Sequence, residues 1–216
     1  MKTLIISDTH LSHVFDEKKY LFLKDLFASV NQIILNGDFW DGHLISFDRF
    51  VTSPWNKLFP ILKNKKAIYL YGNHDRKKFS DNRTSLFSVE QKENYLLVVG
   101  QQKYHIEHGH ILQNSVDVKY NLPKKTWSHI TKAGQRLEHI LSFIGRPHNI
   151  ILKRENLKMK KKLQVMKFPH WYICGHTHFA ELDKTNKFVN SGLVQFGEAS
   201  YLIVDTSGIS LKTDRY

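Results

Sequence analysis

The chain has little cysteine, little proline and no long hydrophobic run. Its 216 residues include a single cysteine, Cys174, so no disulfide can form within the chain, and we expect a reducing, cytoplasmic environment. No stretch approaches the roughly 18 apolar residues that a membrane-spanning helix needs. The apolar run Leu4–Ile6 follows Met1 almost at once, without a charged region and a long apolar region ahead of it, so we expect no signal peptide.

Acidic residues are also in deficit, and the deficit is local. The chain holds 32 Lys and Arg against 20 Asp and Glu, a net charge of +12. Residues 111–170 contain 13 of the basic and 3 of the acidic residues, so this segment carries +10 of that charge. A hydrophobic content of 41% is ordinary for a soluble globular protein, and no low-complexity linker divides the chain. We predict a single domain, residues 1–216, with a basic helical insert at about 111–168.

Apolar periodicity predicts alternating strands and helices in the first third of the chain. Residues 3–7, 32–35 and 67–71 are predicted strands, and 16–30 and part of 46–62 are predicted helices. This order favours parallel strands with crossover helices, and therefore an α/β fold. Further strands are predicted at 95–99, 104–107, 171–174, 188–190, 201–204 and 209–211, and helices at about 127–143 and 153–167.

Side chains of the types that bind metals come directly after several of these predicted strands. In open α/β sheets, functional residues collect at that edge, and carboxylate, amide and imidazole groups together suit Mn, Fe or Zn. Two metal ions roughly 3.5–4 Å apart can clamp the attacking and leaving oxygens of a phosphoryl displacement. The alternative, loop carboxylates and core histidines with local hydrogen bonds, would leave many polar groups near the core. The residues are Asp8, His10, Asp38, Asp41, Asn73, His74, His108, His110, His176 and His178.

Five short motifs contain these residues, in a fixed order between positions 8 and 178. They are D-x-H, G-D-x-x-D, G-N-H-D, H-G-H and G-H-T-H. The series resembles the calcineurin-like metallophosphoesterase superfamily. The resemblance implies a four-layer α/β/β/α sandwich with a dinuclear metal centre at the strand ends. It implies that one metal is held by Asp8, His10, Asp38 and His178, and the other by Asp38, Asn73, His108 and His176.

The resemblance also implies roles beyond metal binding. His74 would face the phosphoryl group and Asp41 would orient it, although an exposed loop aspartate is the alternative for Asp41. We expect His108, and not His110, to be the metal ligand. His110 would either support a ligand from outside the metal's own shell or face the substrate. The two ions are expected to be manganese, with iron or zinc as alternatives, because the same ligands accept all three. Ordinary surface or helix histidines are expected at His13, His43, His105, His129, His139 and His148.

The predicted reaction is hydrolysis of a phosphate ester or anhydride. Within the superfamily, the layout resembles the UDP-2,3-diacylglucosamine pyrophosphohydrolases in length, in a helical insert before G-H-T-H and in the ending at 190–205. It differs from them in H-G-H, where they usually have H-G-D. The expected substrate is a phosphorylated small molecule or a lipid-linked pyrophosphate. The alternatives are a phosphodiesterase or nuclease acting on nucleic acid or cyclic nucleotides, and a non-catalytic scaffold.

The basic insert allows three interpretations. It can be a solvated helical face, a surface that contacts an anionic membrane, or a nucleic-acid-binding surface. We rank the membrane above nucleic acid because an apolar stripe runs beside the charges and no nucleic-acid motif is present. The protein would then be peripheral at the inner face of the membrane. The stripe is Trp127, Ile130, Leu137, Ile140, Leu141, Phe143 and Ile144, and the lysines expected to touch lipid are Lys158, Lys160, Lys161 and Lys162.

Overall fold

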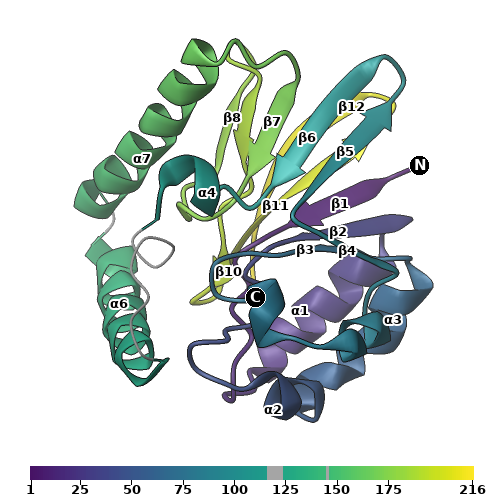
Figure 1. The fold of residues 1–216 in the computed structure, drawn as a ribbon, viewed down its shortest axis with the longest axis vertical. Coiled ribbons are helices and arrows are strands. Elements are labelled where there is room, and N and C mark those ends of the chain that lie inside the picture. The colour runs from purple at the N-terminus through teal and green to yellow at the C-terminus, as the bar shows by residue number, and fades with distance from the viewer. Residues whose placement is uncertain (116–123, 145) are drawn as a thin grey trace.

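Two β-sheets lie face to face, with helices on both outer sides (Figure 1). The computed structural model describes residues 1–115, 124–144 and 146–216. The order helix, sheet, sheet, helix confirms the four-layer α/β/β/α architecture expected from the sequence. One sheet is covered by α1 (Glu17–Ala28), α2 (Phe47–Val51) and α3 (Phe59–Asn64), and the other by α7 (Arg146–Val165).

The larger sheet carries the parallel strands predicted in the first third of the chain. It consists of β1 (Thr3–Ile6), β2 (Gln32–Asn36), β3 (Ile68–Leu70), β4 (Glu90–Lys92), β10 (Val194–Gln195), β11 (Glu198–Asp205) and β12 (Gly208–Arg215). The strand order is β10-β11-β1-β2-β3-β4, with β12 paired to β11. Strands β1 to β4 run parallel, so the loops that follow β1, β2 and β3 leave the sheet at one edge.

The smaller sheet brings the remaining motifs to the same edge. It consists of β5 (Asn94–Val99), β6 (Gln102–Glu107), β7 (Trp171–Cys174), β8 (Glu181–Asp183) and β9 (Phe188–Asn190). Its order is β5-β6-β7-β9-β8, and β6, β7 and β9 are parallel to one another. The loops after β6 and β7 are joined by a hydrogen bond from Gly175 N to His108 O of 3.0 Å.

Side chains of the central strands alternate between two layers of the core, as the two-residue period of a strand requires. Ile5 and Ile34 are fully buried and face the smaller sheet, where they meet Ile106. Their neighbours Leu4 and Ile33 point the other way, into the cluster formed with the covering helices. The predicted strands are therefore buried on both faces, which explains why their sequences are continuously apolar.

The predicted helix at 46–62 is three short pieces. A 3-10 helix, Pro54–Leu58, lies between α2 and α3, and both it and α3 have proline in the first turn, where the missing N–H costs no hydrogen bond. The sequence did not predict β4, β8 and β10, because these strands have two or three residues and are largely polar, so no apolar run marks them. The last two strands, by contrast, are longer than predicted.

The insert forms α4 (His110–Gln113), α6 (Lys124–Ile144) and α7. Helix α7 is fixed to the smaller sheet by Met159 and Leu163, which pack on Tyr172, Cys174 and Phe188. The predicted helices at about 127–143 and 153–167 leave a gap, of which Gly145 lies outside the described residues, whereas residues from Arg146 onward belong to α7, with Pro147 in its first turn. The side chains of the stripe from Ile140 to Ile144 are outside the description as well. Over the described ranges, no helix is long and apolar enough to cross a membrane.

Two of the four lysines expected to touch lipid instead hold α7 to the rest of the protein. Lys160 Nζ lies 2.6 Å from Glu181 Oε1 and 2.9 Å from Asp183 Oδ2. Lys162 Nζ donates to Leu112 O at 2.6 Å. Both amines therefore have partners within the protein, which the helical spacing of the lysines could not show, and contact of the insert with lipid stays a prediction.

Candidate metal centre

The candidate ligands converge because hydrogen bonds join the loops that carry them. His10 N donates to Asp38 O at 2.9 Å, and Gly42 N donates to His74 O at 2.9 Å. The first contact ties the D-x-H loop to the G-D-x-x-D loop, and the second ties that loop to G-N-H-D. The bond from Gly175 N ties H-G-H to G-H-T-H, and a hydrogen bond from His176 N to Asp8 Oδ2 of 3.0 Å joins that pair to the D-x-H loop. All five motifs therefore meet at one edge of the two sheets.

Glycines leave room for this close approach. A Cβ on Gly72 would overlap Asp38 Oδ1, and a Cβ on Gly175 would overlap Asp8 Oδ2. Both carboxylates therefore rest directly against backbone, and an alanine at either position would displace a candidate ligand.

Asp8, His10 and His178 form one half of the site, with ligand atoms within 4.8 Å of one another. His10 Nε2 lies 3.4 Å from His178 Nε2, and His178 Nε2 lies 3.3 Å from Asp8 Oδ1. Asp8 Oδ2 accepts a hydrogen bond from His176 N at 3.0 Å. Asp8 Oδ1 is buried and receives no hydrogen bond from the described residues, which leaves its lone pairs for a cation.

Asp38, His108 and Asn73 form the other half. His108 Nε2 lies 3.2 Å from Asp38 Oδ2 and 3.0 Å from Asn73 Oδ1. His108 Nδ1 lies 2.9 Å from Asn36 O, a contact that directs Nε2 toward the site. The His176 ring lies next to His108, with 5.3 Å between ring centroids.

Asp38 lies between the two halves. His74 N donates to Asp38 Oδ1 at 2.8 Å, which turns Oδ2 toward the histidines. Oδ2 is 3.2 Å from His108 Nε2 and 3.8 Å from His10 Nε2. One carboxylate oxygen therefore faces both halves, as a ligand shared by two ions would.

The site favours positive charge. Burial opposes ionisation of Asp8, but His108 and His178 lower the pKa of this carboxyl to about 2. Burial likewise opposes ionisation of Asp38, and its imidazole neighbours lower its pKa well below the usual range. Burial disfavours the charged form of His108, yet the two carboxylates raise its pKa to about 10. Two buried carboxylates that stabilise a proton on an imidazole would equally stabilise a divalent metal in its place.

His176 has the opposite charge preference. Burial, and then the charge of His108, lower its pKa to about 3. The imidazole is therefore neutral near pH 7, which is the form that can donate a lone pair to a metal. Carboxylate oxygen, amide oxygen and neutral imidazole nitrogen fit the donor set of a borderline divalent ion.

Asp41 and His74 form a pair beside the ligands, and Asp41 is buried, which excludes the exposed-loop alternative. Asp41 Oδ1 lies 3.2 Å from His74 Nδ1, and Oδ2 lies 3.5 Å from His10 Nδ1. Burial opposes ionisation of Asp41, but His74 and His10 hold its pKa well below the usual range. Asp41, His74 and His10 also offer ligand atoms close enough together to hold one metal ion. The distances alone therefore do not show whether Asp41 and His74 orient substrate or bind metal.

Asp75 is a site residue that the sequence reasoning missed. Its carboxylate accepts from Gly72 N at 2.6 Å, Asp38 N at 3.0 Å and Phe39 N at 2.7 Å. Burial, and then the charge of Asp38, raise its pKa to about 7. It joins the ends of β2 and β3 without reaching the ligand cluster. Its position directly after His74 in G-N-H-D was the available signal.

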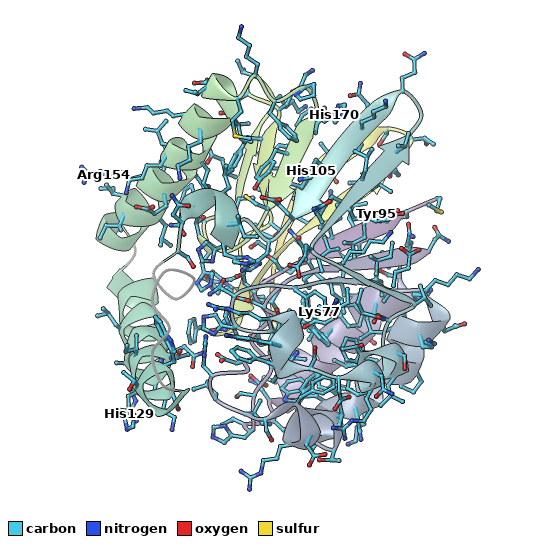
Figure 2. The ribbon with its side chains drawn as sticks, in the orientation of Figure 1. Lys77, Tyr95, His105, His129, Arg154 and His170 are labelled. Atoms are coloured by element: carbon cyan, nitrogen blue, oxygen red, sulfur yellow. The ribbon has the colours of Figure 1, made fainter. Side chains whose placement is uncertain are left out.

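Two histidines expected to be ordinary lie elsewhere. His43 is buried, and its ring centroid is 4.7 Å from that of His74, so the prediction of a surface histidine was wrong. It was missed because a single histidine in a loop has no period. His105 is half-buried on β6 and stacks on Tyr172. His110, at the start of α4, lies next to the candidate ligand His108, with ring centroids 5.4 Å apart. His129 is exposed on the outer side of α6, as expected (Figure 2).

A cavity of about 710 Å³ lies against the cluster. On one side it is lined by candidate ligands and by His74, which is half-buried. Its other side consists of insert residues, among them Trp127, Ile130, Leu137 and Ile151. The cavity therefore joins a polar wall that can bind metal to a largely apolar one.

The fold and the site define a metal-dependent phosphoesterase. A family model for calcineurin-like phosphoesterases matches residues 1–180, and the chain belongs to that family. It is an enzyme of the metallophosphoesterase type. No curated protein matches the sequence.

Solved structures with the same fold include two phosphoesterases. One is an archaeal phosphodiesterase, 18% identical, with 100% of each chain covered and a TM-score of 0.54. Another is YfcE, a phosphoesterase from E. coli, 17% identical, with 97% of this chain and 91% of that chain covered and a TM-score of 0.51. At these identities the likeness concerns the fold alone.

Proposed function

We propose that the protein hydrolyses a phosphate ester or anhydride bond in a substrate that carries an apolar group close to the phosphate. A lipid-linked nucleoside pyrophosphate has this chemistry. The observation that supports the proposal is the cavity, because its ligand-lined wall and its apolar wall face one space of about 710 Å³. A phosphate at the ligands would place an attached acyl chain against α6 and α7.

The residues present fit two divalent ions, of which manganese is the first candidate. Such ions would lower the pKa of water and withdraw charge from the phosphoryl oxygens. Asp38, through Oδ2, is the proposed shared ligand. One ion would be held by Asp8, His10, Asp38 and His178, and the other by Asp38, Asn73, His108 and His176.

His74 is the proposed catalytic residue, and Asp41 orients it. His74 lines the cavity, and Asp41 Oδ1 lies 3.2 Å from its Nδ1. An imidazole held in this way can donate to a phosphoryl oxygen or to the leaving group, where negative charge increases during the reaction.

The cavity mouth is the proposed membrane contact. Ile130, Leu137 and Ile151 line the cavity and are 48%, 57% and 57% exposed. Lys153 and Arg154 follow on α7 and are exposed, and Arg154 projects away from the sheets (Figure 2). Apolar residues flanked by cations suit an anionic membrane surface, so we propose that the enzyme acts peripherally at the inner face of a membrane.

The competing function is a phosphodiesterase or nuclease that uses the same cations to bind nucleic acid. Nucleic-acid sites commonly combine cations with several aromatic platforms, whereas the large apolar side chains on the insert wall of this cavity include one aromatic, Trp127, and four aliphatic residues, Ile130, Leu137, Ile151 and Leu152. The lipid-linked substrate is therefore the better candidate.

A substrate pair tests the proposal directly. Metal-loaded protein should hydrolyse an acylated UDP-sugar with a kcat/KM at least about tenfold above that of the same UDP-sugar without acyl chains. Leu137→Ser and Ile151→Ser should reduce that preference while leaving the non-acylated substrate unchanged. Val165→Ser, at the exposed end of α7, is the matched control and should keep the preference. Equal rates on both sugars, or faster hydrolysis of single-stranded DNA or a cyclic nucleotide, would exclude the lipid-linked substrate.

A further inference from the structure

Helix α6 of the insert contacts the Asp41–His74 pair. Gln135 Nε2 donates to Asp41 Oδ2 at 3.1 Å, while Asp41 Oδ1 faces His74 Nδ1. Oδ1 also accepts from His43 N at 3.0 Å. The two oxygens are therefore divided, one toward His74 and one toward the insert and His10.

A second contact links the same helix face to the same pair. The His43 ring lies between His74 and Trp127, with centroid distances of 4.7 Å and 5.7 Å. Trp127, Thr131 and Gln135 follow one another at intervals of four, so they lie on one face of α6. All three line the cavity. One side of the helix thus meets the pair at two points.

We propose that Gln135 is a positioning residue for His74 and acts through Asp41. The proposal deepens the function above and rests on the role proposed there for His74. Among the described residues, Gln135 is the hydrogen-bond donor closest to Asp41 Oδ2. If its amide is removed, the contact of Oδ2 with His10 Nδ1 at 3.5 Å remains. Asp41 can then rotate toward His10, and the His74 ring loses its fixed direction.

The proposal gives the insert a second task. The core fold supplies Asp41 and His74, but a donor from α6 completes their arrangement. Trp127, Ile130 and Leu137 of α6 form part of the apolar wall of the cavity, and Gln135 of the same helix is the donor to Asp41. Substrate binding and orientation of His74 would then depend on one helix.

A double-mutant cycle on a small soluble diester, bis(4-nitrophenyl) phosphate, tests this. The small substrate is chosen because it does not need the apolar wall. Gln135→Leu should lower kcat about tenfold, the low end for residues that orient a functional group, and leave KM within about twofold. His74→Ala should lower kcat by about 10²–10⁴-fold. In the His74→Ala background, Gln135→Leu should have almost no further effect, because the group that it positions is gone.

Matched variants exclude a packing effect. Gln135→Glu keeps the shape but replaces the donor with a carboxylate, so it should lose at least as much kcat as Gln135→Leu. Gln164→Leu is the same substitution on α7, where Gln164 is exposed and bonds Asn186, and it should keep wild-type kcat. Equal losses from Gln135→Leu in both backgrounds, or no loss at all, would overturn the positioning role alone. A wild-type kcat for His74→Ala would instead overturn the proposed function of His74.

Discussion

At the scale of single residues, the candidate ligands share an uncommon backbone conformation. Five of them have positive φ: Asp8 at 52°, His10 at 42°, Asp38 at 51°, His176 at 68° and His178 at 61°. L-residues seldom adopt this region, and the conformation costs on the order of 1–3 kcal/mol at each position. The loops accept this strain because the turn directs each side chain back over its strand end, toward the others.

Asp38 is predicted to be the residue on which metal content depends most. Its Oδ2 faces both halves of the site, whereas Asp41 belongs to the His74 pair. Asp38→Ala should therefore leave fewer than one metal per chain after reloading, while wild type should approach two. Elemental analysis of protein purified without chelator and then reloaded gives this number.

Asp41→Ala is the matched control, because it also removes a buried carboxylate from a neighbouring position in the same loop. It should bind metal almost as well as wild type and lose activity only. A wild type that stays below one metal after reloading would exclude the dinuclear site. Equal metal loss in both variants would show that Asp41 is itself a ligand.

At the scale of elements, α1 supports the site through one buried amine. Lys19 is on the buried side of the helix, and its Nζ donates to Thr9 O in the D-x-H loop. Burial lowers the pKa of Lys19 from 10.5 to about 7, and Asp16 only partly opposes this. A lysine at a core position thus fixes the loop that carries Asp8 and His10.

Lys19 is predicted to make stability depend on pH. Between pH 7 and 10.5 the unfolded chain binds a proton at Lys19 that the native chain has released, so this residue makes stability rise with pH. Its destabilising effect is complete below about pH 7 and disappears near the unfolded pKa. Lys19→Met removes this dependence. The free energy of unfolding of Lys19→Met, relative to wild type, should therefore fall from pH 7 to pH 10 in denaturant titrations of the metal-free protein.

Lys18→Met provides the comparison, since Lys18 is the adjacent residue and is exposed. This variant should follow the wild-type curve over the same pH window. If the Lys19→Met variant also follows the wild-type curve, Lys19 is protonated in the native protein over the whole pH range. Its hydrogen bond to the D-x-H loop then does not require a neutral amine.

At the scale of the whole molecule, the basic charge and the cavity mouth lie in the same segment. Residues 111–170 carry +10 of the +12 charge, and the apolar wall of the cavity comes from α6 and α7. We predict binding to vesicles that contain anionic lipid, weakening as salt rises, because surface charge is screened within about 10 Å at 0.1 M. Replacing Lys153 and Arg154 with Gln should weaken sedimentation with such vesicles and spare hydrolysis of a small diester.

Lys18→Gln with Lys24→Gln is the control for this experiment. Both residues are exposed on α1, which covers the opposite sheet, so the net charge changes equally at a different place (Figure 1). That pair should bind vesicles as wild type does. If wild type ignores anionic vesicles at low salt but binds single-stranded DNA tightly, a nuclease replaces the lipid-linked function.

Much of the site could be predicted because its residues are marked locally. Asp8, Asp38 and Asn73 each follow an apolar run that is readable as a strand, and parallel strands end at a common edge. The order of the five motifs needs no three-dimensional information either. The four-layer architecture was expected from the family resemblance, whereas the apolar runs themselves indicate only that the strands are covered on both faces.

Contacts between distant segments were decided only by the tertiary structure. Gln135 reaches Asp41 across 94 positions, and His43 packs between His74 and Trp127. No period or motif marks these residues, because a period reports which side of one element is buried and not what that side meets. Lys160 shows the same limit, since its acidic partners lie on β8. The side chains of the candidate metal centre were therefore readable from short local motifs, whereas the groups around that centre depend on how the insert packs.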